Sequence, residues 1–216
     1  MNKLFDINNP FFKFMSKFFD LMVLSLIFTV CCIPIVTIGP AITALYYSTV
    51  KNVRRDRSYA YKEFFHSFKR DFRQSIISWL IILGVTIVIL LDIRILNVSQ
   101  DKTIGPFRIV YLVAIALIAF ITMYVFPLIS RFTLSMKDLF KLAFFLSLKY
   151  FPETILSLVI LAAGFVALYV SYFVFLFFVP GAVAILISFP MEHVLKKTLK
   201  QIGTGEDNNP DQWYEE

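Results

Sequence analysis

The stretch "CCIPIVTIGPAITALYY", residues 31–47, interrupts the first long apolar run of the chain. Pro34, Gly39 and Pro40 fall within seven residues, and the apolar character continues on both sides of them. A proline removes a backbone donor and disturbs the preceding helical turn, but it fits the first turn of a new helix. We therefore expect Pro34 to kink a membrane crossing near its end. Gly39–Pro40 should end that crossing and start a helix that leaves along the inner membrane surface.

The composition of the chain predicts an integral membrane protein. It has 216 residues, of which 58% are hydrophobic and 17% charged, and its mean hydropathy is +0.74. Soluble domains carry about 25% charged residues, whereas apolar runs of about 20 residues span the hydrocarbon layer as helices. The alternating strands of a transmembrane barrel are absent. We expect an all-α polytopic membrane helical bundle over residues 1–200, followed by an acidic, disordered cytoplasmic tail over residues 201–216.

Five apolar runs are long enough to cross the membrane, and their flanking charges predict an orientation. The expected spans are Leu21–Ile38, Gln74–Leu96, Pro106–Ser130, Glu153–Val170 and Ser171–Met191. With this division, fifteen Lys and Arg residues fall on one side and six on the other. Basic residues accumulate on the cytoplasmic side of membrane proteins. We therefore expect a multi-pass protein of a bacterial plasma membrane with its N-terminus outside and its C-terminus in the cytoplasm.

Residues 60–73, "AYKEFFHSFKRDFR", form the best-patterned segment outside the spans. The aromatic residues recur at spacings of three and four, which places them on one face of a helix with basic residues around the rest. Such a helix suits the inner headgroup layer. Two interpretations are open: the helix packs under the bundle and anchors it, or it docks a cytoplasmic partner. Candidate contacts to a partner or to lipid headgroups are Arg54, Arg55, Arg57, Phe68, Lys69, Arg70, Arg73 and Arg131.

Short internal echoes indicate a weak parallel hairpin repeat. Each of three prolines precedes a helix-compatible stretch that reaches a lysine ten or eleven residues later; they are Pro40, Pro127 and Pro190. In addition, "FFHSFKRDF" (64–72) resembles "FFLSLKYF" (144–151). The repeated module would be a basic interfacial helix, two spans, a proline break and a basic helix, with the first copy truncated to one span. Chance convergence of Phe-rich basic segments is the alternative, and a broken helix lining a substrate cavity is a further interpretation of the breaks.

Signals for chemistry are scarce. The chain contains no P-loop, nucleophile elbow or zinc-protease motif, and its two histidines, His66 and His193, lack a patterned carboxylate partner for a metal. The centres of the spans hold little charge, so no proton relay is evident. We expect a protein that is not an enzyme and holds no metal or cofactor. The basic surface follows the membrane topology, so lipid headgroups rather than nucleic acid are the expected partners.

The segment "IGPAITALYYSTVKNVRRDRSYAYKEFFHSFKRDFRQSIISWLI" (38–81) resembles the signature region of the YesL-like family, bacterial membrane proteins of unknown function. "YVFPLISRF" (124–132) is similar to a later segment of that family. The resemblance implies a genomic setting beside carbohydrate ABC importers. Our leading hypothesis is therefore a non-enzymatic accessory subunit of such an importer, in contact with its permease and ATPase chains. The alternative is a self-contained carrier or channel for small solutes.

Overall fold

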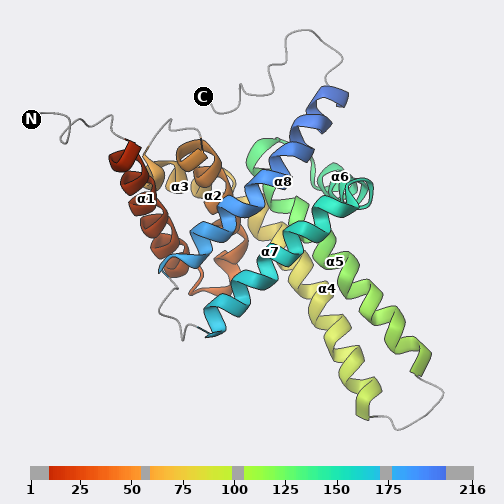
Figure 1. Cartoon of the computed structure of the whole chain (residues 1–216). Helices are drawn as coiled ribbons and strands as arrows, with labels where there is room; N and C mark the ends of the chain where they lie inside the picture. The colour runs from red at the N-terminus through yellow and green to blue at the C-terminus, as the bar shows by residue number, and fades with distance from the viewer. Residues whose placement is uncertain (1–9, 55–58, 99–104, 171–176, 203–216) are drawn as a thin grey trace, which may run out of the picture.

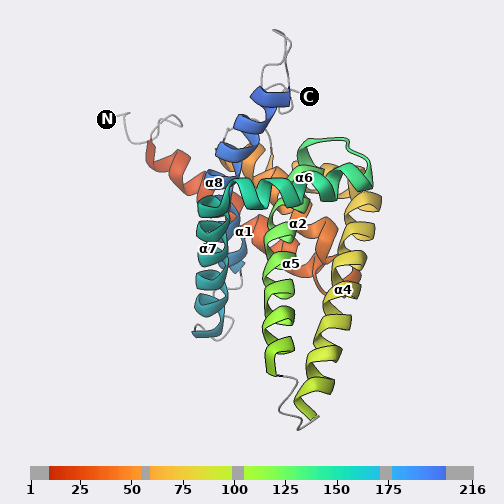
Figure 2. The same ribbon diagram turned by 90° about the vertical axis from the view of Figure 1, so that its right-hand side faces the viewer.

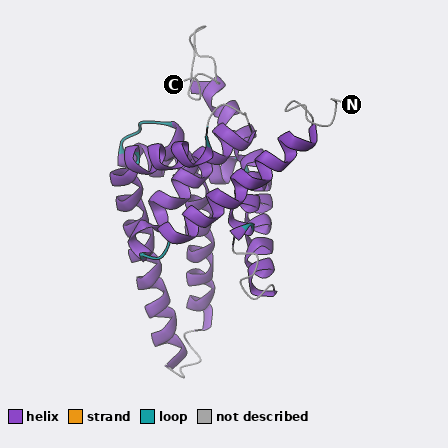
Figure 3. Ribbon diagram, turned by 90° about the vertical axis from the view of Figure 1, so that its left-hand side faces the viewer, coloured by secondary structure: helices purple, strands orange, loops and turns teal. Residues whose placement is uncertain are grey.

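The structure, a computed structural model, describes residues 10–54, 59–98, 105–170 and 177–202. All regular elements in this part of the chain are helices (Figure 3), so the predicted all-α membrane bundle is confirmed. The predicted acidic tail lies outside the described residues from position 203 onward. The elements are α1 (Pro10–Cys31), the 3₁₀ helix η1 (Ile35–Thr37), α2 (Ile38–Ser48), the π-helix η2 (Thr49–Arg54), α3 (Ala60–Arg70), α4 (Phe72–Val98), α5 (Gly105–Arg131), α6 (Met136–Lys149), α7 (Phe151–Val170) and α8 (Val179–Ile202).

The described helices form three hairpins, α1–α2, α4–α5 and α7–α8, which are connected through α3 and α6 (Figures 1 and 2). Both connecting helices lie at the same end of the molecule, which we call the α3–α6 end. Four helices in the described part are long and apolar enough to cross a membrane, which makes this a multi-pass membrane protein. They cover Phe72–Ile95, Ile109–Arg131, Phe151–Val170 and Val179–Thr198.

The first hairpin differs from the other two because its return arm is short. α2 has 11 residues, so it is about 16 Å long, roughly half of a hydrocarbon layer of about 30 Å. The turn before α2 accordingly lies well above the far ends of α4 and α5 (Figures 2 and 3). The predicted span Leu21–Ile38 is therefore not one helix: α1 ends at Cys31 and the chain turns back.

This return changes the expected path of the chain. α1 begins at the α3–α6 end, and α8 ends there too (Figure 1). The prediction had the two termini on opposite sides because it treated α1 as a single crossing followed by an interfacial helix. Pro40 does stand in the first turn of α2. However, α2 does not leave along the membrane surface: from Gly39 to Ser48 all its residues except Ile42 are buried.

Side-chain donors bind three backbone carbonyls in the turn between α1 and α2. The Thr37 hydroxyl donates to the carbonyl oxygens of Cys31 at 2.6 Å and of Pro34 at 2.8 Å. The indole Nε1 of Trp79, on α4, donates to the carbonyl of Ile35 at 2.8 Å. Unpaired backbone groups are costly at membrane depth, so these bonds stabilise the chain reversal at η1, which has no buried residue.

Close packing of α2 against α4 depends on Gly39. A Cβ atom at this position would lie 2.6 Å from the Cβ of Trp79 and 2.7 Å from the carbonyl oxygen of Ser75. Both neighbours belong to the rigid part of α4 and could not move aside without shifting that helix. Gly39 is therefore required by the helix contact.

Pro127 and Pro190 do not break their helices, contrary to the prediction. Pro127 lies inside α5 and Pro190 inside α8, and both helices continue past them. A proline costs one backbone hydrogen bond, whereas ending a helix at membrane depth would release several donors and acceptors. A hydroxyl near each proline supplies a local bond: Ser130 donates to the carbonyl of Pro127 at 2.8 Å, and Ser188 donates to that of Ile185 at 2.6 Å.

The hairpin arrangement gives the internal echoes a structural meaning. Each echo covers the end of a connecting helix and the start of the next hairpin, and its serine, Ser67 or Ser147, is fully buried. Two buried hydroxyl pairs at 2.9 Å then link successive hairpins: Thr43 with Ser75, and Tyr124 with Thr154. The first copy, which was predicted to be truncated to one span, contains two helices, α1 and the shorter α2.

Candidate functional site

Two charged side chains meet in the interior where α5 and α8 cross near the α3–α6 end. Arg131 is the last residue of α5, and its Nη1 lies 3.2 Å from Oε1 of Glu192 on α8. The Arg131 side chain is 0% exposed and that of Glu192 is 2% exposed. The hydroxyl of Tyr46, on α2, donates to the same carboxylate oxygen at 3.1 Å. We call Tyr46, Arg131 and Glu192 the buried triad.

Burying the two charges of the triad costs desolvation free energy, so their place in the interior requires a physical explanation. Taking both charges out of water costs several kcal/mol per ion, which their attraction only partly offsets. Within the described residues, Oε2 of Glu192 is buried and has no hydrogen-bond partner. Ionisable groups inside a membrane bundle commonly mark function or helix pairing. In geometric terms, the triad fixes α2, α5 and α8 to one another.

A second polar group lies at the end of α2, where the π-helix η2 meets α3. Nζ of Lys51 lies 3.2 Å from Oε2 of Glu63 and donates to the Tyr47 hydroxyl at 3.2 Å. The guanidinium of Arg70 stacks 4.8 Å from the centre of the Tyr47 ring. Burial disfavours the charged form of Lys51, but the hydrogen bonds and charges of Tyr47 and Glu63 outweigh burial, so the pKa of Lys51 is raised. These contacts hold α3 against α2 and η2.

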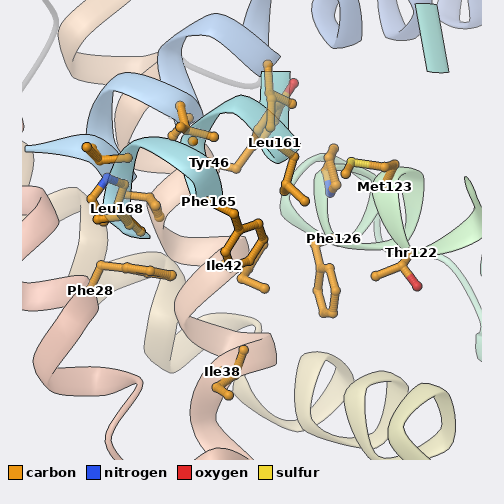
Figure 4. Close-up of a pocket in the computed structure, with 18 residues that line it drawn as sticks. Phe28, Ile38, Ile42, Tyr46, Thr122, Met123, Phe126, Leu161, Phe165 and Leu168 are labelled. Atoms are coloured by element: carbon orange, nitrogen blue, oxygen red, sulfur yellow. The ribbon is translucent and has the colours of Figure 1, made fainter. Parts of the chain in front are cut away.

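An apolar cavity of about 390 Å³ lies between α2, α5, α7 and α8 (Figure 4). Its walls are formed mostly by aliphatic and aromatic side chains, among them Ile42, Phe126 and Leu161. Tyr46 belongs both to this wall and to the buried triad. The cavity and the ion pair are therefore neighbouring parts of one region.

The predicted contact residues fall into four groups. Lys69 and Arg73 are exposed at the α3–α6 end. Phe68 is half-buried, with its ring 6.0 Å from that of Phe64 and 5.4 Å from that of Phe72. Arg55 and Arg57 lie outside the described residues, as does the side chain of Arg54.

Two predicted contacts make internal bonds instead. The prediction assigned Arg131 to partner or headgroup binding, but its side chain is enclosed in the buried triad, so this assignment is wrong. Arg70 remains partly exposed and donates to both Asp71 and the backbone carbonyl of Ser130. α3 packs on α1 and α2 through Ala60, Phe64 and Ser67. These contacts agree with the interpretation in which α3 packs against the bundle and anchors it.

Sequence reasoning missed Tyr46, Glu192 and the cavity. Glu192 directly follows the predicted last span, Ser171–Met191, and no role was predicted for it. The usable signal was that Arg131 and Glu192 carry opposite charges and that each directly follows a predicted span, Pro106–Ser130 and Ser171–Met191. For the described residues, no group of three or more His, Cys, Asp or Glu side chains is placed to hold a metal ion.

Comparison with known proteins finds a matching family model and a similar bacterial protein. Residues 18–93 match the family described as "Protein of unknown function, DUF624". The chain is 28% identical to "Uncharacterized protein YesL" of Bacillus subtilis (strain 168) over 182 residues, which cover 83% of this chain and 84% of that protein. No solved structure matches the chain. These two similarities confirm the predicted resemblance to the YesL-like family.

Proposed function

We propose that this chain is a non-enzymatic accessory subunit that binds other membrane subunits, namely the permease of a carbohydrate ABC importer and, through it, the ATPase. The proposal rests on the family resemblance for the identity of the partner and on the α4–α5 hairpin for the manner of binding. Its site is a helix face rather than a reaction centre.

The observation that supports this proposal is the isolation of the far half of the α4–α5 hairpin. In α4 the buried residues are Ser75, Ser78 and Ile82, and none of residues 83–95 is buried; in α5 none of residues 109–123 is buried. This far half projects away from the other helices (Figures 1 and 2). Helix association in lipid depends on packing, and these apolar flanks are available to pack against helices of another protein.

The orientation that we propose places the α3–α6 end in the cytoplasm. Exposed cations cluster at this end, including Lys62, Lys69 and Arg73 near α3 and Lys137 and Lys141 on α6. Such clusters favour the cytoplasmic leaflet of a plasma membrane. With this orientation both the start of α1 and the end of α8 face the cytoplasm.

Co-purification tests the proposal. The tagged chain would be extracted from native bacterial membranes in a mild detergent, and permease and ATPase chains would be identified by mass spectrometry. Val88→Trp changes the projecting part of α4, and Val159→Trp is its control on α7 because both valines are 58% exposed. We expect Val88→Trp to lose the permease and Val159→Trp to retain it.

Two results would contradict parts of the proposal. Absence of permease and ATPase chains from the unmodified preparation rejects the importer as partner. Equal permease recovery with Val88→Trp and Val159→Trp rejects the hairpin as the binding surface.

The second candidate function is a self-contained carrier or channel for small solutes. The observation that favours it is the buried triad, since carriers use ionisable groups inside the membrane. Purified protein in liposomes should then move a radiolabelled sugar, and Glu192→Gln should abolish the flux. An accessory subunit should show no flux in either form, so one assay separates the two functions.

A further inference from the structure

Among the described residues that line the apolar cavity, no polar side chain is available to a hydrophilic ligand. Tyr46 and Thr122 carry the hydroxyl groups of its wall. Tyr46 already donates to Glu192, and Thr122 donates to the carbonyl of Ile118 at 2.7 Å. A buried water needs two to four polar partners, and a sugar needs several convergent ones. Neither suits this wall.

The cavity borders the lipid-facing surface of the bundle. Phe165, on α7, belongs to its wall and is 64% exposed, whereas Phe126 on the opposite side is 2% exposed. Figure 4 shows side chains from α2, α5 and α7 around the same space. α7 packs mainly on α8 and touches α5 more lightly, so the cavity lies where two hairpins meet. In a membrane, the medium at such an opening is hydrocarbon.

We propose that this cavity binds one acyl chain of a membrane phospholipid, which enters from the bilayer beside Phe165. Its volume of about 390 Å³ lies in the range of small ligand sites. A chain in this space restores dispersion contacts that an empty cavity lacks. It joins α5 to the α7–α8 hairpin and ends next to Tyr46, so lipid binding supports the region that holds the buried triad. This proposal is independent of the accessory-subunit function.

Photolabelling tests this directly. The protein would be reconstituted in phosphatidylcholine vesicles that contain a trace of phosphatidylcholine with a diazirine midway along one acyl chain. After irradiation, peptide mapping would compare adducts on Met123, Leu161 and Phe165, which line the cavity, with adducts on Val88 and Leu91, which are exposed on α4. We expect more adducts per residue in the cavity. Uniform labelling of the two sets would overturn the proposal.

A filling variant with a matched control makes the test specific. Leu161→Trp occupies the cavity, whereas Leu156→Trp places the same side chain on the exposed face of α7, where Leu156 is 51% exposed. Leu161→Trp should lower labelling of Met123 to the level found at Val88 and Leu91 on α4, because the indole occupies the space of the acyl chain. Leu156→Trp should label like the unmodified protein. Equal labelling in both variants would place the lipid elsewhere.

A second filling variant and a second photoreactive probe complete the test. Ile42→Phe fills the cavity from the α2 wall and provides the same readout if Leu161→Trp fails to fold. A free fatty acid with the same diazirine identifies the source of the chain. Labelling of the cavity by the fatty acid and not by phosphatidylcholine would reject a phospholipid as the ligand.

Discussion

α2 and α4 have nearly the same average hydrophobicity, but they use it in opposite ways. α2 is buried along almost its whole length by α1, α3, α4, α5 and α8. α4 has no buried residue between positions 83 and 95. Hydropathy therefore identifies membrane helices without separating those that face protein from those that face lipid.

The difference between the two helices lies in the size and polarity of their side chains. α2 carries Gly39, Ala41, Thr43, Ala44 and Ser48, all of which are buried. The exposed part of α4 is mainly Ile, Val and Leu. Small residues let helix backbones approach and hydroxyls bond across the contact. α2 is thus equipped for a protein environment and the far part of α4 for hydrocarbon or for a partner helix.

The largest expected effect comes from removing the Glu192 carboxylate on α8, which contacts Tyr46 on α2 and Arg131 on α5. Glu192→Ala leaves the enclosed Arg131 guanidinium without its carboxylate, and we expect the free energy of unfolding to fall by about 3–5 kcal/mol. Thermal or denaturant unfolding in detergent micelles measures this. Lys197→Ala, an exposed charge on the same helix, should change stability by less than about 0.5 kcal/mol.

A compensated variant sharpens this result. Arg131→Met combined with Glu192→Leu removes both charges, so it should be more stable than Glu192→Ala alone. If Glu192→Ala matches the Lys197→Ala control, the enclosed ion pair does not exist in the folded protein.

The sequence predicted those parts of the fold that depend on hydropathy and period. The apolar runs around α4, α5 and α7 were long and uninterrupted, and the 3.6-residue pattern located α3. The echoes of residues 64–72 and 144–151 indicated the repeat because they mark the same junction in two hairpins.

The path after Pro40 could not be predicted from the same signals. Pro40 starts a helix, while Pro127 and Pro190 sit inside helices, and proline chemistry alone does not separate the two cases. The direction of α2 depends on contacts with distant residues, such as Trp79 against Gly39. The buried triad was missed for a similar reason, because Arg131 and Glu192 become partners only when α5 and α8 cross.

An intermediate effect on stability is expected from adding one methyl group at Gly39, and the same change at Gly84 is its control. Gly39→Ala forces its Cβ against Trp79 and Ser75 on α4, so we expect it to lower the free energy of unfolding by about 1–3 kcal/mol. Gly84→Ala is the matched change on α4, where nothing lies within 4 Å of the added atom. It should be neutral or stabilise by up to about 1 kcal/mol. Denaturant unfolding of both variants in the same detergent gives the comparison, and equal changes would contradict the close α2–α4 contact.

The smallest effect concerns the hydroxyl pair between Thr43 on α2 and Ser75 on α4, which lie 2.9 Å apart. A double-mutant cycle of Thr43→Val and Ser75→Ala should give a coupling of about 0.6 kcal/mol, the average for such bonds in membrane proteins. Thr86 is the control because its hydroxyl donates to the carbonyl of Ile82 in its own helix at 2.7 Å. The cycle of Thr43→Val with Thr86→Val should show no coupling, since no bond joins these two residues. A Thr43–Ser75 coupling equal to that of the control would mean that shape alone, without hydroxyl pairing, separates the buried α2 from the exposed α4.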